Sequence, residues 1–163
     1  MKVMGIDPGL SGGIAFYDGT TLEVVATPVL VEEFIKNGKK STRNLMNLPV
    51  VRDLILHHKP DRAVLEKVAA RSGQGVTSMF RFGMNFGEHR GIMSALAIPF
   101  IEVTPQTWKK DYRLNSDKDD SLDLAREVFP DHAKTSFRLK KHDGLAEAAL
   151  IAKFGFDNPK TFE

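Results

Sequence analysis

The sequence predicts an α/β domain in which a mixed five-stranded sheet is flanked by helices. Two observations carry this prediction: short apolar runs bounded by turn residues, and longer segments with helical periodicity between the later runs. Asp18-Gly19 joins the second and third runs, so the first three predict a meander. The later runs alternate with helices, which makes the sheet mixed. The predicted strands cover residues 2–7, 14–17, 22–27, 62–66 and 100–103.

The segment 78–97 has the clearest helical pattern, with apolar residues and one histidine recurring at intervals of three and four. A second ridge at spacing four is made of glycine and alanine, and each interior glycine costs about 1 kcal/mol relative to alanine. We therefore expect the sheet or a partner helix to approach that ridge closely. The stripe is Met79, Phe82, Phe86, His89, Met93 and Leu96, and the ridge is Gly83, Gly87, Gly91 and Ala95.

Three further helices are expected. The first begins at Ser41 or Thr42 and carries Leu45, Leu48, Val51, Leu54, Ile55 and His58 at helical spacing. The second covers 119–129, capped by Ser116 and stopped by Pro130; its apolar face would be Leu122, Ala125, Val128 and Phe129. The third covers 143–154. Residues 30–43 are expected to form an exposed excursion, residues 68–77 a loop, and Trp108 to lie on a turn or short helix.

Composition favours an ordinary globular protein. The chain has 163 residues, of which 42% are hydrophobic and 27% charged, a size that suits one domain. No run of 18 apolar residues exists that would span a membrane, and the start lacks the pattern of a signal peptide. There are no cysteines, which excludes disulfides and thiolate metal sites. We expect a soluble, intracellular protein, in the cytoplasm of a bacterium or a phage-infected host rather than in an organelle.

The net charge of +2 does not by itself indicate a nucleic-acid binder, but basic residues are clustered. Such clusters fit phosphate contacts, and they equally fit solvated lysines on exposed loops. The three clusters are Lys36, Lys39, Lys40 and Arg43; Lys109, Lys110 and Arg113; and Lys134, Arg138, Lys140 and Lys141.

Four carboxylates stand at the ends of predicted core elements. Asp7 and Glu66 each end a strand, while Asp143 and Glu147 are four apart on the last helix and share one direction. Taken singly, Asp7 fits a turn, Glu66 a surface pair with Lys67, and Asp143 a helix cap. Glu147 lies within an apolar stripe and is expected to face the sheet. Gathered together, such acids repel one another unless a cation is present, and oxygen ligands favour Mg²⁺ or Mn²⁺.

The motifs around these acids resemble those of RuvC-like Holliday junction resolvases, which have the RNase H-like fold. The similar stretches, in order, are GIDPGLSGGIA, VLEKV, the segment from GQGVTSMF to PQTWKK, and KKHDGLAEAALIAKFG. Only residues 28–58 match loosely, so the resemblance covers most of the chain. The spacing of four between Asp143 and Glu147 resembles the phage and chloroplast branch, whereas bacterial enzymes place these ligands three apart.

The resemblance implies a single nuclease domain over residues 1–163, an endodeoxyribonuclease that resolves four-way DNA junctions by paired symmetric nicks. Asp7, Glu66, Asp143 and Glu147 match the metal-binding acids of the family, with His142 an alternative to Asp143. Two Mg²⁺ ions per site would support hydrolysis, with Mn²⁺ as a substitute, leaving a 5′ phosphate and a 3′ hydroxyl. Two symmetric cuts imply a twofold homodimer, for which the segment 78–97 is the candidate interface.

For contacts to branched DNA we single out residues near the second acid and after the fifth strand. Phe80 is expected to wedge against an unstacked base, with a place in the protein core as the alternative. The set is Arg71, Gln74, Phe80, Arg81, Lys109, Lys110 and Lys118. Rival functions are a nuclease on other branched DNA or on RNA, a non-catalytic junction-binding module, and a structural adaptor.

Overall fold

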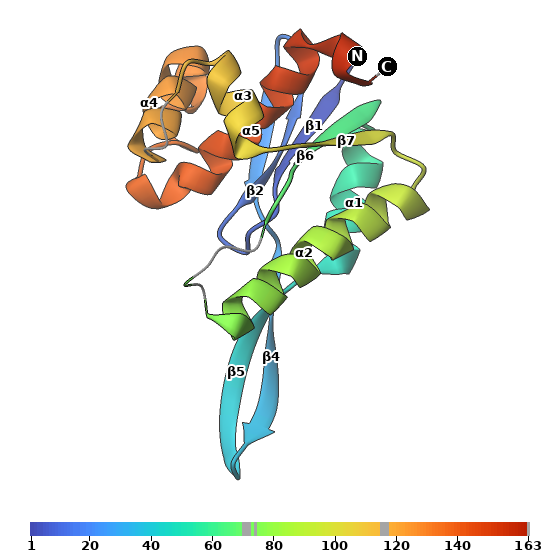
Figure 1. Cartoon of the computed structure of the whole chain (residues 1–163), viewed down its shortest axis with the longest axis vertical. Helices are drawn as coiled ribbons and strands as arrows, with labels where there is room; N and C mark the ends of the chain where they lie inside the picture. Colours follow the sequence, from blue (N-terminus) through green and yellow to red (C-terminus); the bar gives the residue numbers. More distant parts are fainter. Residues whose placement is uncertain (70–72, 74, 115–117, 163) are drawn as a thin grey trace.

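The computed structural model describes residues 1–69, 73, 75–114 and 118–162, with only the backbone at 118 and 119. It forms an α/β fold in which two groups of helices cover the two faces of one sheet (Figure 1). The elements are β1 (Val3–Asp7), β2 (Gly13–Tyr17), β3 (Leu22–Ala26), β4 (Val29–Lys36), β5 (Lys39–Met46), α1 (Leu48–His58), β6 (Arg62–Glu66), α2 (Val76–Ala95), β7 (Phe100–Val103), α3 (Pro105–Asp111), α4 (Lys118–Val128) and α5 (Asp143–Asp157), with short 3₁₀ turns at Pro130–His132, Lys140–His142 and Pro159–Phe162.

The main sheet has five strands in the order β3-β2-β1-β6-β7. β2 is antiparallel to β1 and β3, whereas β1, β6 and β7 are parallel, so the predicted mixed sheet is confirmed. Because β1 and β3 both pair antiparallel with β2, they run in the same direction as β6. The carboxyl ends of four strands, β1, β3, β6 and β7, therefore meet at one end of the sheet.

Strand alternation divides the core between the two faces of the sheet. Ile6 and Leu65 pack in the cluster beneath α1 and α2, whereas Val3 and Val64 face α3, α4 and α5. α5 lies closest to the sheet because Gly5 has no side chain: an added Cβ would collide with the backbone of Ala148 and Ala152. This contact presses the start of α5 against the end of β1.

The expected helix from Ser41 or Thr42 is wrong, because these residues lie in β5. β4 and β5 form a separate two-stranded hairpin that projects beyond the sheet, where the sequence predicted an irregular excursion (Figure 1). Its turn is Asn37-Gly38, with both φ angles positive at 51° and 73°, as a two-residue hairpin turn requires. The helix begins only at Leu48, after Asn47 accepts a hydrogen bond from Val50 N–H.

The other helices lie close to their predicted places. α2 runs over Val76–Ala95, α4 over Lys118–Val128 with Leu122, Ala125 and Phe129 buried, and α5 continues to Asp157. Ser116, the predicted cap, lies outside the described residues. Within the described chain, nothing lies within 4 Å of a Cβ added at Gly83, Gly87 or Gly91, so the sheet does not approach the glycine ridge.

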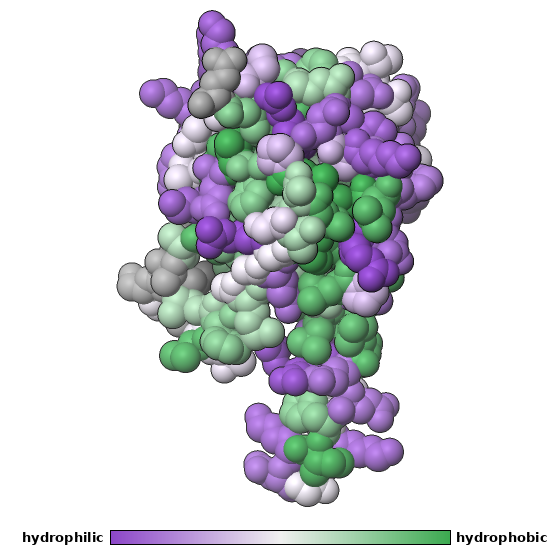
Figure 2. Space-filling model, turned by 90° about the vertical axis from the view of Figure 1, so that its right-hand side faces the viewer, coloured by the Kyte–Doolittle hydropathy of each residue, from purple (hydrophilic) through white to green (hydrophobic). Residues whose placement is uncertain are grey.

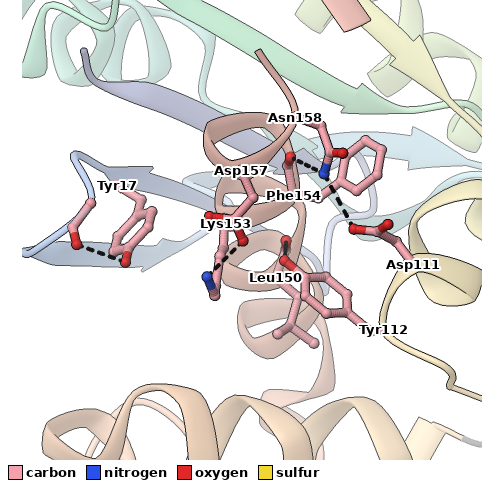
Figure 3. A network of polar contacts seen from close by, with 9 residues as sticks. Tyr17, Asp111, Tyr112, Leu150, Lys153, Phe154, Asp157 and Asn158 are labelled. Carbon is pink, nitrogen blue, oxygen red and sulfur yellow. Dashed lines mark hydrogen bonds and ion pairs between the residues drawn. The ribbon is translucent and has the colours of Figure 1, made fainter. Parts of the chain in front are cut away.

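Polar contacts fix α3 against α5. Tyr112, just after α3, donates its hydroxyl to the Leu150 carbonyl at 3.2 Å, and the Asn158 amide donates to Asp111 Oδ2 at 3.2 Å (Figure 3). Burial raises the pKa of the Tyr112 hydroxyl, followed in effect by the negative charges of Asp157 and Asp111. These contacts hold the short helix that carries Trp108 and Lys109. Among the described residues, no helix has both the length and the apolar character needed to cross a bilayer.

Candidate active site

Asp7 and Glu66 lie on adjacent strands at the same end of the sheet. Ile6 pairs with Leu65 in the parallel register of β1 and β6, and each strand has its acid at the next position. Asp7 is half-buried and Glu66 is 8% exposed. The two strand-end acids of the sequence prediction are therefore neighbours in space.

The third region of the site is the start of α5, which is packed against the loop after β1. A Cβ added at Gly144 would lie 2.5 Å from the Ser11 carbonyl oxygen and 3.0 Å from Asp7 Oδ2. On the loop itself, a Cβ at Gly12 would lie 2.9 Å from the same carboxylate oxygen. These two glycines allow the helix start, including the adjacent Asp143, to approach Asp7.

Glu66 is oriented by Trp108 of α3. The indole Nε1 donates to Glu66 Oε1 at 2.9 Å, and the Trp108 side chain is completely buried. An indole has a single N–H donor and no acceptor, so this hydrogen bond holds the carboxylate without neutralising it. The contact joins residues 42 positions apart in the sequence.

Glu147 points toward α3 and α4 from the buried side of α5. It is 8% exposed, and its Oε1 receives a hydrogen bond from Lys109 Nζ at 2.7 Å and another from Ser121 Oγ at 3.4 Å. The ammonium balances a carboxylate that burial would otherwise destabilise. The prediction that Glu147 faces the sheet side of the helix is consistent with this burial.

Asp143 and His142 occupy the turn that leads into α5. His142 Nδ1 accepts a hydrogen bond from the backbone N–H of Leu139 at 3.4 Å, which closes the 3₁₀ turn before the helix. Asp143 is half-buried and is the first residue of α5. The local role of His142 makes Asp143 the better candidate for the fourth acid.

The donor chemistry fits a hard divalent cation, because four carboxylates contribute only oxygen ligands. Over the ranges that the structure describes, however, no three histidine or acidic side chains lie close enough together to hold a metal ion. Glu66 and Glu147 are engaged instead by Trp108 and Lys109. If Glu147 held a cation through Oε1, the Lys109 ammonium would have to move away from that oxygen.

The residues expected to contact DNA fall in different places. Phe80 on α2 is 68% exposed, so it is not a core residue, and Arg81 beside it is also exposed. Lys110 is exposed, whereas Lys109 is the partner of Glu147. Arg71 and Gln74 lie outside the described residues, and of Lys118 only its backbone in α4 is described.

Two polar contacts of the site were missed by the sequence reasoning. Trp108 and Ser121 both donate to the acids, yet Trp108 was expected only on a turn or short helix, and Ser121 carried no expectation. The available signal in the sequence was a serine four residues before Ala125, and therefore on the predicted apolar face of the helix. The structure shows that Ser121 is fully buried. Its partner follows only from the packing of α4 on α5.

Several solved structures resemble this one. Thermus thermophilus RuvC in complex with a Holliday junction substrate matches with a TM-score of 0.63 and 13% identity over 96% of this chain and 95% of that one. A further structure of Thermus thermophilus RuvC matches with a TM-score of 0.60 and 16% identity, over 98% of this chain and 97% of that one. The yeast mitochondrial Holliday junction resolvase matches with a TM-score of 0.53 and 17% identity, over 98% of this chain and 79% of that one.

No protein-family model and no curated protein matches the sequence. At such low identities the structural likenesses show the fold, and the chain therefore has a RuvC-like, RNase H-like fold. The fold expected from the four motifs is confirmed. The assignment to a phage or chloroplast branch stays a prediction.

Proposed function

We propose that this protein is a Mg²⁺-dependent endodeoxyribonuclease that resolves four-way DNA junctions by paired symmetric nicks. One observation carries the proposal: in a RuvC-like fold, β1 and β6 end in adjacent acids, and α5 brings two more to the same end of the sheet. A solved structure with this fold is RuvC bound to a Holliday junction substrate. We infer that the whole chain works as one nuclease domain.

In this proposal, the acids act through two divalent cations. Asp7, Glu66, Asp143 and Glu147 would hold these cations, which would supply activation of a water molecule and offset charge on the scissile phosphate. Trp108 holds the Glu66 carboxylate in one orientation. Lys109 would give up Glu147 to a cation, and its ammonium would then be available to pair with the phosphate. Such pre-positioning keeps the acids close to their productive geometry.

The DNA would cross the end of the sheet that carries these acids. Phe80 and Arg81 on α2 and Lys110 on α3 are exposed. Phe80 suits a wedge between bases, because its aromatic ring is 68% exposed and therefore accessible to DNA. We extend the proposal to Arg71, Gln74 and Lys118 as further phosphate or base contacts.

Symmetric cutting calls for two active sites related by a twofold axis, so we propose a homodimer. The exposed face of α2 is our candidate interface. It combines the glycine ridge with the exposed apolar side chain of Met84, and leaves Phe80, nearer the start of the helix, to the DNA. A face without bulky side chains lets two helices approach closely, and apolar residues around it supply buried area.

The alternative within the same fold is a nuclease on flaps, three-way branches or RNA. Such a nuclease would use the same acids, so the residues of the site do not distinguish it from a junction resolvase. Only the nucleic acid that is cut distinguishes the two. A non-catalytic junction-binding module would retain binding without cutting.

The deciding experiment digests labelled four-way, three-way, flap and linear duplexes with Mg²⁺ and maps the cuts on each strand. We expect symmetric nicks in the four-way junction, none after chelation, and binding without cutting for Asp7→Asn and Glu147→Gln. Asp131→Asn is the matched control, because Asp131 is an exposed acid of the Pro130–His132 turn. Wild-type cutting by either site variant would refute the assignment of the acids, and stronger cutting of flaps would favour the alternative.

A further inference from the structure

The β4–β5 hairpin is the largest feature of the fold that the proposed active site does not use. It stands away from the body of the molecule, and polar side chains extend from both of its edges (Figures 1 and 2). Each strand has eight residues, which at the usual rise places the tip roughly 25 Å from the root. An isolated two-stranded hairpin is at best marginally stable in water, so an arm of this length depends on contacts between its strands and on its attachment to the sheet.

The root of this arm is attached to the loop that follows Asp7. Asp7 pairs with Gly13 on β2, and Gly13 pairs with Ala26 at the end of β3, so these three residues form one row across the sheet. Thr27 then donates its backbone N–H to the Gly12 carbonyl at 3.2 Å and its hydroxyl to the Gly9 carbonyl at 2.9 Å. The arm therefore leaves the molecule from the end of the sheet that carries the acids.

Contacts within the hairpin keep it extended. On one face, Arg43 forms an ion pair with Glu32 on the opposite strand and lies 5.4 Å from the centre of the Phe34 ring. The second strand is also held at the root, where Asn47 N–H donates to the Pro28 carbonyl at 2.8 Å. An arm with this preorganisation loses little conformational freedom when it binds.

The tip of the arm is basic. Lys36 and Lys39 face each other across the Asn37-Gly38 turn, and Lys40 follows on the other face beside Ile35. All three lysines are exposed, and in the described part of the chain none of them takes part in an ion pair. Ile35 is 67% exposed and Val31, on the same face, is 63% exposed.

We infer that the β4–β5 hairpin is a DNA-contacting arm whose three tip lysines bind backbone phosphates of a duplex segment beside the active site. Its reach of roughly 25 Å is a little under one turn of duplex, which is about 34 Å, so one duplex can touch both the acids and the tip. Three positive charges attract phosphates, and the exposed Ile35 side chain beside Lys40 suits contact with sugars. This inference rests on the proposed nuclease function, because that function brings DNA to the end of the sheet that carries the acids and from which the arm extends.

The test compares a triple tip variant, Lys36→Gln, Lys39→Gln and Lys40→Gln, with a control variant, Lys2→Gln, Lys59→Gln and Lys160→Gln. The control lysines lie near Arg62, at the opposite end of the sheet, where β1 and β6 begin. Affinity for a labelled four-way junction and a linear duplex is measured across a salt series. Each lost phosphate contact lowers the slope of log K against log salt by about 0.9. For the tip variant, we expect the magnitude of this slope to fall by about 2 to 3 and the affinity for DNA to fall at least about 10-fold. We expect no change in either quantity for the control variant.

The outcomes separate this inference from the proposed function. If the wild type binds duplex DNA but never nicks, the nuclease proposal fails while loss of affinity in the tip variant still supports the arm. If the wild type nicks and the tip variant keeps the wild-type slope, the arm is refuted. A tip variant with unchanged DNA affinity but altered sedimentation would make the hairpin a contact between copies of this chain, which also overturns the inference.

Discussion

The indole N–H of Trp108 donates to Glu66 Oε1 at 2.9 Å, which ties a completely buried side chain of α3 to an acid at the end of β6. The chain segment that carries Trp108 is itself held by Tyr112 on the Leu150 carbonyl. An acid that must share a cation with other acids needs a fixed orientation, and this hydrogen bond provides it. The same relationship explains why a tryptophan, and not another large apolar residue, fits this position.

We predict that Trp108→Phe lowers the nicking rate and the affinity for Mn²⁺ by about 10- to 100-fold each, the usual effect of losing a hydrogen bond to a metal ligand. Phenylalanine keeps most of the buried apolar surface but has no donor. Tyr17→Phe is the control, because it removes a hydrogen bond to the Gly19 carbonyl at the far end of β2, where Tyr17 pairs with Val3. Calorimetric titration with Mn²⁺ gives the affinity independently of activity, and equal affinities for Trp108→Phe and wild type would contradict the positioning role.

We predict that Lys109→Met lowers the Tm without metal and enlarges the rise in Tm caused by Mg²⁺. The ammonium lies 2.7 Å from Glu147 Oε1, and the two side chains are only 15% and 10% exposed. Removing one member of a buried pair leaves an uncompensated charge, which typically costs about 3–5 kcal/mol. A bound cation would then replace the missing charge and add its own stabilisation.

The control for this experiment is Lys110→Met, since Lys110 is an exposed neighbour on the same helix. Thermal unfolding in EDTA and in a Mg²⁺ series gives both quantities. An unchanged Mg²⁺ response in Lys109→Met would show that the cation and the lysine do not compete for Glu147.

We predict that the protein loses stability as the pH falls from about 6.5 to about 4, partly because of His89. Burial lowers the pKa of this histidine from 6.5 to about 4 in the folded chain, and among the described residues its Nε2 has no hydrogen-bond partner. Between these values the unfolded chain binds a proton that the folded chain does not, so the stability present above pH 6.5 is lost on acidification. The contribution is on the order of 3 kcal/mol.

His89→Phe should therefore flatten the dependence of the unfolding free energy on pH across this window, with little loss at pH 8. His57→Gln serves as control, because His57 is exposed on α1. Urea unfolding at several pH values measures both variants. Identical pH profiles for His89→Phe and wild type would mean that other groups cause the acid sensitivity.

We predict that Gly87→Leu converts a dimer into a folded monomer. No atom of the described chain lies within 4 Å of an added Cβ at Gly87, so a larger side chain fits the monomer and removes a helix penalty of about 1 kcal/mol. Between two closely packed copies of α2, the same side chain would clash. Sedimentation of Gly87→Leu against Glu127→Leu, an exposed position on α4, measures the effect. A wild-type monomer, or a dimer that tolerates leucine, would refute α2 as the interface.

The hairpin shows where local pattern reasoning failed. Asn37-Gly38 is a strong signal for a two-residue turn, and it lies between two runs of eight residues that form β4 and β5. The apolar residues around Leu45 and Leu48 also fit helical spacing, so the helix was expected to start too early. The short-range signal of the turn was the better guide, because strand pairing across it satisfies the inward-facing backbone groups of both strands.

The sequence proposes the candidate acids as a set of residues but not their arrangement. Asp7, Glu66 and Glu147 stand out in the sequence because charged side chains at the ends of apolar elements are costly without a partner. Which partners they meet depends on packing: Trp108 reaches Glu66 across 42 residues, and Lys109 reaches Glu147 across 38. Contacts between residues so far apart in the chain leave no periodic pattern in the sequence.

The amino-acid sequence by itself determined the five strands of the main sheet, most of the helices and the candidate acids, because apolar spacing and turn residues act over a few positions. Only the tertiary structure decided that the start of α5 lies against the loop after β1, through Gly12 and Gly144, and that the hairpin leaves from that same end. The physical reason is that side-chain partners and the direction of an arm are set by the packing of elements far apart in the chain, where each contact depends on all the others being formed.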